Sequence, residues 1–225
     1  MTAPTTYANL ITSIGEYLHR TDVATAAPEW ITDAETVMNY GDGDEIKGLR
    51  TAAQETITTL TCTAGTQTVA LPSDYLDMRK LYLNYGGVRI EMVQIPVLPM
   101  TQDERSNVNA VPWGFIITGS NLYLVTIPNS NYTLTLDYYA KIGPLATSST
   151  NWLLTMAPDV YRSGAITMGA AWLGASFDPA PWFRRFKAAM GLVAASDSDR
   201  RGGITTMRTE CANLNRNVSN IYMGW

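Results

Sequence analysis

The sequence predicts an α+β protein in which helices near both ends form one bundle and an antiparallel β module is inserted between them. Apolar residues recur at helical spacing in the first 50 residues and again after Ser149. From about Thr51 to Ile142 the chain is rich in Thr, Val, Ile and Tyr and is punctuated by turn residues. Neither helical segment can bury its apolar stripe alone, so the simplest arrangement packs the two together.

This pattern divides the chain into four segments. Residues 1–50 and 146–202 supply the helices of one helical domain, and residues 51–145 form an inserted β-sandwich or barrel. Residues 203–225 are poor in aliphatic side chains and show no period, which predicts an extended C-terminal arm.

Two amphipathic helices are expected at the start of the chain. The first spans residues 7–19, and its apolar positions are Tyr7, Leu10, Ile11, Ile14, Tyr17 and Leu18. The second begins at Pro28, since proline is well suited to the first helical turn. Its apolar stripe consists of Trp30, Ile31, Ala34, Val37 and Met38, and the helix ends at Gly41.

Strand and turn signals fill the middle segment. The clearest strand is 131–140, where Tyr132, Leu134, Leu136 and Tyr138 alternate with polar residues, so one face should be buried and the other solvated. Turns at 86–87 and 119–120 contain glycine and predict two hairpins, which join 76–85 to 88–92 and 114–118 to 121–126. Two further strands are expected at 56–63 and 66–71, and residues 96–105 should be a short helix or a loop.

Two more helices are expected after Ser149. One runs from Pro158 to about Gly174, and its small residues would let a neighbouring helix come close: Ser163, Gly164, Gly169 and Ala170. The other begins at Asp178-Pro179. It should bury Trp182, Phe183, Phe186, Met190 and Val193, and expose Arg184, Arg185 and Lys187. This basic face is a candidate contact surface. We expect the acidic first pair of helices, with Glu16, Asp22, Glu29, Asp33 and Glu35, to lie near the basic last pair.

The C-terminal arm combines a glycine hinge with an aromatic end. Gly202 and Gly203 precede it, and it closes with Ile221, Tyr222, Met223, Gly224 and Trp225. Chain ends are usually polar and frayed unless something holds them. The aromatic side chains therefore either fold back onto their own domain or dock into a neighbouring protein, where Trp and Tyr are favoured anchors. The hinge favours docking.

Composition and charge exclude several classes of protein. Residues 1–161 hold eight basic and 16 acidic residues, a net −8, whereas residues 162–225 hold eight basic and four acidic residues, a net +4. A chain with an overall net charge of −4 is a poor general nucleic-acid binder, because that affinity depends on Lys and Arg. We also expect no secretory signal and no membrane span.

Patterns that would indicate catalysis or metal binding are weak. The single histidine, His19, ends a predicted helix, where a histidine is favourable for electrostatic reasons alone. Cys62 and Cys211 lie far apart and fit no metal or redox spacing, so we expect two reduced thiols. Asp42-Gly43-Asp44 lacks the later Gly and Glu of a calcium loop. We therefore expect no enzyme activity, metal or cofactor.

Several motifs, in this order and spacing, resemble those of the head-to-tail adaptor (connector) proteins of podovirus-like and related tailed bacteriophages. They are Pro28-Glu29-Trp30-Ile31 with Ala34-Glu35, Leu71–Tyr82, Pro112–Gly119 and Tyr132–Ala140. The most specific is Thr150-Asn151-Trp152-Leu153-Leu154 followed by Pro158-Asp159-Val160-Tyr161. The resemblance covers about residues 5 to 195. The sequence departs from the family at Met38-Asn39-Tyr40, where basic residues are common, and at Ala157, where His or Tyr is common.

The resemblance implies a structural protein of the virion that is synthesised in the cytoplasm of the bacterial host. Copies of the chain would form a ring, usually a dodecamer that matches the twelvefold portal, and would extend the DNA channel below it. DNA would pass through the ring without specific binding. The implied partners are the portal protein, other copies of the chain, and later tail, nozzle or fibre proteins. The helices would carry the ring and portal contacts, with Arg184, Arg185 and Lys187 as candidates.

Two other functions remain as alternatives. The β module could recognise carbohydrate or a host receptor as a tail-associated binding module, which saturable glycan binding by residues 51–145 would support. The chain could instead be a cell-wall hydrolase of the tail, which would require activity on peptidoglycan that is lost on carboxylate substitution.

Overall fold

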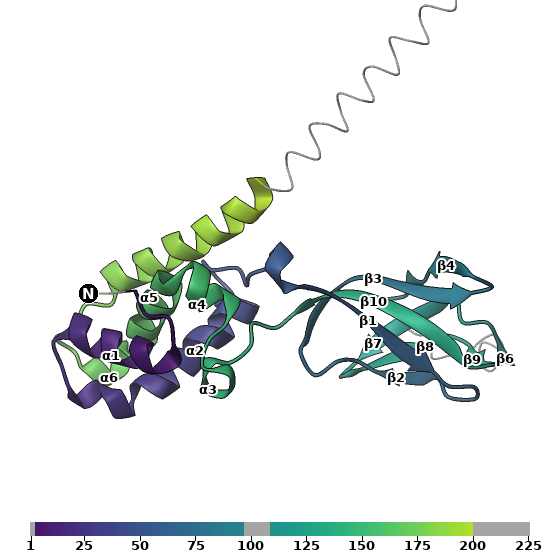
Figure 1. Ribbon diagram of the computed structural model, residues 1–225, viewed down its shortest axis with the longest axis horizontal. Coiled ribbons are helices and arrows are strands. Elements are labelled where there is room, and N and C mark those ends of the chain that lie inside the picture. Colours follow the sequence, from purple (N-terminus) through teal and green to yellow (C-terminus); the bar gives the residue numbers. More distant parts are fainter. Residues whose placement is uncertain (1–2, 97–108, 200–225) are drawn as a thin grey trace, which may run out of the picture. The chain divides into compact units, whose positions relative to one another are not determined.

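The computed structural model describes residues 3–96 and 109–199 of the chain (Figure 1). The predicted α+β class is confirmed, because helices and antiparallel sheets are both present. The chain divides into two compact units. One contains the residues up to Ala52 together with those from Ile142 onward, and the other is Ala53–Lys141. The expected C-terminal arm and the 97–105 part of the expected loop lie outside the described residues.

The first unit opens with the two helices expected from the sequence. Helix α1 spans Tyr7–Leu18 and is capped by the side chain of Thr6, which accepts a hydrogen bond from the backbone N–H of Asn9. A 3-10 turn, η1 (Asp22–Thr25), leads to α2 (Ala27–Tyr40). Pro28 therefore lies within the first turn of α2, as its chemistry favours.

The rest of this unit follows the β module in the sequence. Short helices α3 (Leu145–Ser148) and α4 (Trp152–Met156) precede α5 (Pro158–Met168) and α6 (Ala170–Leu173). A long helix then spans residues 180–199, and Asp178 accepts a hydrogen bond from the N–H of Ala180 at its start. The single helix predicted over 158–174 is thus interrupted at Gly169.

Glycines let the helices of this unit approach closely. A Cβ built on Gly169 would lie 2.5 Å from the indole ring of Trp30, and one on Gly164 would lie 2.9 Å from the ring of Phe186. The expectation that small residues in 158–174 admit a neighbouring helix is therefore confirmed. The largest fully buried side chains here are Leu10, Ile14, Ile31, Met38, Leu49, Tyr161 and Phe186.

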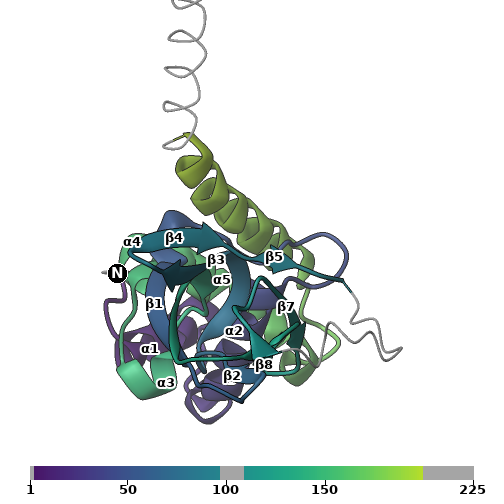
Figure 2. The ribbon, with the colours of Figure 1, turned by 90° about the vertical axis from the view of Figure 1, so that its right-hand side faces the viewer.

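The second unit contains two four-stranded sheets, whose strands are labelled in Figure 2. The first has the order β1 (Glu55–Cys62), β10 (Tyr132–Ala140), β3 (Tyr75–Tyr85), β4 (Val88–Glu91), all antiparallel, and η2 (Ala52–Gln54) precedes it. The second has the order β2 (Thr68–Ala70), β8 (Asn121–Leu124), β7 (Gly114–Thr118), β5 (Val93–Gln94). Strands β6 (Asn109–Ala110) and β9 (Ile127–Pro128) form a small third pair.

One hydrophobic core is shared by the two large sheets. Its buried members are Cys62, Val69, Leu81, Leu83, Met92, Phe115, Leu122, Leu124, Leu134, Leu136 and Tyr138. Both predicted hairpins are confirmed. Gly86 and Gly87 join Tyr85 to Val88 with positive φ at both positions, and Gly119 adopts φ 60° in the turn between Thr118 and Asn121.

The β module also departs from the expectation in three respects. The pairs β5–β7 and β6–β9 are parallel, which the long connections between those strands permit. Strands β1 and β2 belong to different sheets. Strand β10 lies between β1 and β3, so Thr135 on its expected solvent face is buried and accepts a hydrogen bond from Asn84.

Candidate functional site

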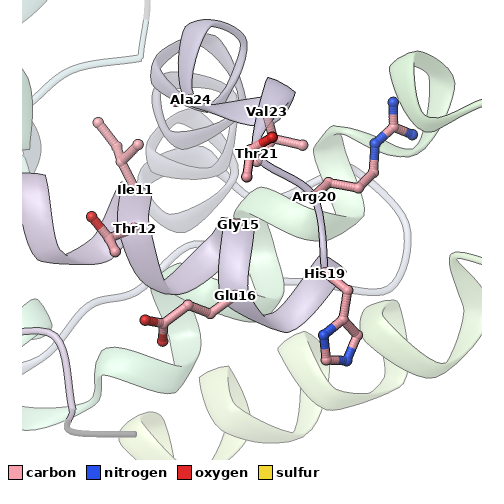
Figure 3. A pocket seen from close by; sticks show the side chains of 9 residues that line it. All are labelled: Ile11, Thr12, Gly15, Glu16, His19, Arg20, Thr21, Val23 and Ala24. Atoms are coloured by element: carbon pink, nitrogen blue, oxygen red, sulfur yellow. The ribbon is translucent and has the colours of Figure 1, made fainter.

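A groove lies between α1 and η1 in the helical unit (Figure 3). It has a volume of about 570 Å³ and is lined by Ile11, Thr12, Gly15, Glu16, His19, Arg20, Thr21, Val23 and Ala24. Gly15 is one of the lining residues, and a Cβ there would approach the carbonyl oxygen of Arg20 to 2.9 Å. The groove is wide and mainly apolar, so it suits a side chain of another molecule better than a reaction.

The polar rim of this groove is engaged in local contacts. The Arg20 guanidinium hydrogen-bonds to both carboxylate oxygens of Asp22, and this interaction lowers the pKa of Asp22. The same guanidinium lies 5.0 Å from the ring centroid of Trp172. His19 ends α1 in the left-handed conformation, and its backbone N–H donates to the carbonyl of Glu16. His19 therefore has a structural role as the residue that ends α1.

The predicted basic face lies on helix 180–199, and all three of its residues are exposed as expected. Arg185 Nε donates to a carboxylate oxygen of Asp159 at 2.8 Å, and Lys187 Nζ donates to Glu45 at 2.6 Å. Arg184 Nε donates to the carbonyl oxygen of Ala180 in its own helix. Asp159 and Glu45 are therefore the acidic partners of Arg185 and Lys187. The expected closeness of the first and last helix pairs is confirmed, because α5 packs against both α1 and α2.

The remainder of this helix presents an uncharged face. Phe186, Met190, Val193 and Asp197 form the buried stripe, whereas the exposed positions from 188 to 198 are Ala188, Gly191, Leu192, Ala194, Ala195, Ser196 and Ser198. Leu192 is 72% exposed. Grooves of about 320 Å³ and 290 Å³ flank the helix, and Ala194 lines the first while Leu192 lines the second. We name these seven exposed positions between 188 and 198 the uncharged helix face. Such an apolar surface is typical of a protein contact.

A buried polar network fixes the segment that leads from the β module back to the helices. Asn39 in α2 accepts a hydrogen bond from the N–H of Ile142 at 2.8 Å, and Glu35 accepts one from the N–H of Leu145 at 2.8 Å. Asn151 donates to the carbonyl of Gly143 and to the hydroxyl of Tyr161, and caps α4 by accepting from the N–H of Leu154. This network explains the Asn151 and Tyr161 positions of the motif quoted above.

Burial dominates the electrostatics of this network. It raises the pKa of Glu35, although hydrogen bonds from Leu145 and Tyr161 act in the opposite direction. Burial also raises the pKa of Tyr161. A neutral Tyr161 hydroxyl can therefore accept from Asn151 at 2.6 Å while it donates toward Glu35. Sequence reasoning missed this network, because Glu35 appears there only as one of the acidic residues of the N-terminal helices.

The side chains that could bind a metal ion or act as nucleophiles are dispersed over the described residues. No set of three His, Cys, Asp or Glu side chains in ranges 3–96 and 109–199 could hold a metal ion. Cys62 is buried in the core of the β unit, and burial raises the pKa of its thiol to about 11. None of the helices within these ranges is long and apolar enough to cross a membrane.

The remaining predicted site residues lie outside the described residues. They are the hinge glycines Gly202 and Gly203 and the arm residues Ile221, Tyr222, Met223 and Trp225.

Comparison with known proteins assigns the chain to a family. The family model of the SU10 adaptor protein matches residues 5–209. The chain belongs to the SU10 adaptor protein family. This confirms the resemblance to phage head-to-tail adaptors, and it makes the chain a structural adaptor protein of a bacteriophage particle. No curated protein matches the chain.

The SU10 adaptor match spans most of the surfaces described above. It includes the α1–η1 groove, the buried network, the β unit and the uncharged helix face. It also extends to residue 209, beyond the end of the sequence resemblance at about residue 195, and so includes Gly202 and Gly203. The aromatic end from Ile221 to Trp225 lies beyond the matched residues.

Proposed function

We propose that this protein forms a ring beneath the portal of a tailed phage, extends the DNA channel and provides the attachment surface for later tail proteins. Membership of the SU10 adaptor family supports this role. The uncharged helix face is the surface that we propose makes the contact. A helix that exposes Leu192 among small uncharged residues gains by covering them with another subunit or with the portal. The ring would be found in the virion after synthesis in the host cytoplasm.

The C-terminal arm is the second proposed contact. Tyr222 and Trp225, with Ile221 and Met223, would dock into the portal, and Gly202 with Gly203 would give the arm its freedom of direction. The proposed ring has twelve copies to match the portal. Arg184 is exposed near the uncharged helix face and donates a hydrogen bond to Ala180 of its own helix, whereas Arg185 and Lys187 are joined to Asp159 and Glu45.

We propose that the wall of the channel repels the DNA that passes through it. The net −8 of residues 1–161 would place negative charge near the lumen, so that DNA passes without being retained. Retention of DNA by assembled rings that weakens as salt rises would contradict this arrangement.

Native mass spectrometry with the portal protein of the same phage tests the proposed function. Full-length chains should add to the portal in a fixed ring number, and chains truncated after Gly203 should not. Leu192→Asp should also prevent addition, because it buries a charge in the contact. Thr36→Asp, on the exposed side of α2, is the matched control and should add normally. If the full-length chain binds the portal at no ratio, the adaptor role is wrong.

A further inference from the structure

The β unit exposes apolar side chains along the β3–β4 hairpin. Tyr85, Val88 and Ile90 are 49%, 61% and 45% exposed. Ile90 pairs with Leu83, which is only 1% exposed, so Ile90 lies on the core-facing side of the sheet. Val88 and Tyr85 pair with each other on the same side. These residues therefore form an apolar strip beside the core that the described residues leave uncovered.

Strand β4 is also an edge strand. Within the described ranges it pairs only with β3. Tyr85 and Val88 flank a two-residue turn, and residues in that position form a hydrogen-bonded pair. Hydrogen-bonded and non-hydrogen-bonded pairs alternate along an antiparallel ladder, so Leu83 and Ile90 form the next hydrogen-bonded pair. The hydrogen bond from the N–H of Met92 to the carbonyl of Leu81 agrees with this alternation, because this pair lies two residues beyond Leu83 and Ile90. Consequently the backbone N–H and C=O groups of Arg89 and Glu91 point away from β3, toward the free edge.

We propose that β4 docks antiparallel against β4 of a second copy of this chain, with Ile90 facing the partner's Ile90. This register pairs Arg89 with the partner's Glu91, and Glu91 with the partner's Arg89. Arg89 and Glu91 are the residues whose backbone groups face the free edge. Each Arg89–Glu91 pair therefore forms main-chain hydrogen bonds as well as an ion pair. The facing isoleucines occupy a non-hydrogen-bonded position, where side chains approach most closely.

Charge selects this register over its neighbours. A shift that centres the pairing on Arg89 places two arginines opposite each other, and a shift that centres it on Glu91 places two carboxylates together. Parallel in-register pairing sets like charges side by side as well. Like charges directly opposite destabilise a sheet, whereas opposite charges stabilise it. A free edge that carries charges of one sign discourages pairing, but the alternating Arg89 and Glu91 favour pairing with the same sequence reversed.

The charged side of the sheet accommodates the partner. Lys80 Nζ lies 3.0 Å from a carboxylate oxygen of Glu91, so Glu91 would lie between Lys80 and the partner's Arg89. The same sheet already holds a cation between two carboxylates, where Arg79 contacts both Glu55 and Asp137. An alternation of charges across the extended sheet is thus an arrangement that this protein already uses.

This contact goes beyond the proposed ring. It is two-fold and isologous, whereas the contacts that close a ring are head-to-tail. It therefore predicts a dimer of the free chain that forms in the absence of portal, and its existence does not depend on whether the chain binds a portal.

Sedimentation velocity of the purified full-length chain, over a range of concentrations and without portal, tests the dimer. Arg89→Glu alone and Glu91→Arg alone should each weaken dimerisation about tenfold or more, because two opposite-charge pairs become like-charge pairs. The double swap, Arg89→Glu with Glu91→Arg, restores both opposite-charge pairs across the contact and should recover most of the dimerisation, although position 91 then carries an arginine beside Lys80. Lys47→Glu, an exposed change on the helical unit, is the control and should leave the dimer unchanged.

Hydrogen exchange supplies a second measurement. The amides of Arg89 and Glu91 should exchange more slowly as the chain dimerises, while circular dichroism should show that all four variants remain folded. A chain that stays monomeric at every concentration overturns the proposal. So does a dimer that survives both single substitutions, or a double swap that dimerises no better than the single variants.

Discussion

At the scale of single residues, Glu35 connects segments that lie far apart in the sequence. Its carboxylate accepts a hydrogen bond from the N–H of Leu145 at 2.8 Å, and the Tyr161 hydroxyl lies 3.5 Å away. Its backbone carbonyl accepts a hydrogen bond from the side chain of Asn39. A carboxylate in this position caps the segment that begins α3, but it does so in a buried environment that disfavours its charge.

We predict that Glu35→Gln stabilises the protein at neutral pH. Since burial raises the pKa of Glu35 in the folded state, the carboxyl costs nothing below its unfolded pKa of about 4.3 and lowers stability as pH rises through the folded pKa. A glutamine oxygen keeps the acceptor without the charge. The variant should therefore melt about 2–4 °C higher at pH 7, or roughly 1 kcal/mol, and the difference should disappear near pH 4.

Thermal melts followed by circular dichroism across this pH range provide the measurement. Glu16→Gln is the matched control, because Glu16 is an exposed carboxylate on α1 and should show no comparable gain. A Glu35→Gln variant that is less stable than the unchanged protein at pH 7 would show that the ionised form is favoured in the fold.

At the scale of helices, the approach of α2 to the end of α5 depends on the absence of one side chain. Trp30 packs on Gly169, and its indole ring also meets Trp172 edge-on, with centroids 5.4 Å apart. Gly169 has φ −72°, so its backbone would suit any residue, and the requirement for glycine comes from packing alone. The break between α5 and α6 lies at this contact.

We predict that Gly169→Ala destabilises the protein by about 1–3 kcal/mol, because the added methyl overlaps the Trp30 ring. Gly191→Ala is the matched control on helix 180–199. No heavy atom lies within 4 Å of a Cβ at Gly191, so this change should stabilise the helix by about 0.5–1 kcal/mol. Chemical denaturation of both variants measures the two effects, and equal effects of the same sign would contradict the packing argument.

The longer helices and both hairpins could be predicted because each depends on local signals, whereas the short helices α3 and α4 were not expected. Thr6, Pro28 and Asp178 mark helix starts, and Gly86-Gly87 supplies the positive φ of a tight turn. The break at Gly169 depends on Trp30, which lies far away in the sequence, and so does not appear in the periodicity of 158–174. Strand partners are equally non-local. The pattern of 131–140 indicated a strand, but not that β10 would have neighbours on both sides.

The candidate contacts show the same division. Helical spacing placed Arg184, Arg185 and Lys187 on an exposed face, because burial of one stripe follows from the period. The partners of Arg185 and Lys187 are Asp159 and Glu45, which come from other segments and could be identified only in the tertiary structure. The position of β4 at the edge of its sheet could not be predicted either, since a sequence can indicate a strand without showing whether it has one neighbour or two.

At the scale of the whole chain, each compact unit has a hydrophobic core of its own. The core of Ala53–Lys141 draws on both large sheets and includes Phe115, Leu122 and Leu134. Its first and last strands are neighbours, because Glu55 in β1 pairs with Tyr139 in β10. The two ends of the β unit are therefore held together by its own hydrogen bonds.

We predict that the isolated fragment 53–141 folds on its own with a cooperative thermal transition. A fragment that ends at residue 130 is the control and should remain unfolded, because it lacks β10, the strand between β1 and β3. Circular dichroism and the dispersion of amide NMR signals distinguish the two outcomes. A 53–141 fragment without a cooperative transition would show that the core in this unit does not suffice.

The pairing of β1 with β10 sets an order of events during synthesis. Helices α1 and α2 leave the ribosome before the β module, yet their partner α5 and helix 180–199 follow it. The β unit is complete once Lys141 has emerged, and can fold while the first two helices still lack the surfaces that cover Leu10, Ile14 and Trp30. The nascent chain therefore carries an uncovered apolar helix pair through the translation of the entire β module, which makes that pair the segment most in need of a chaperone.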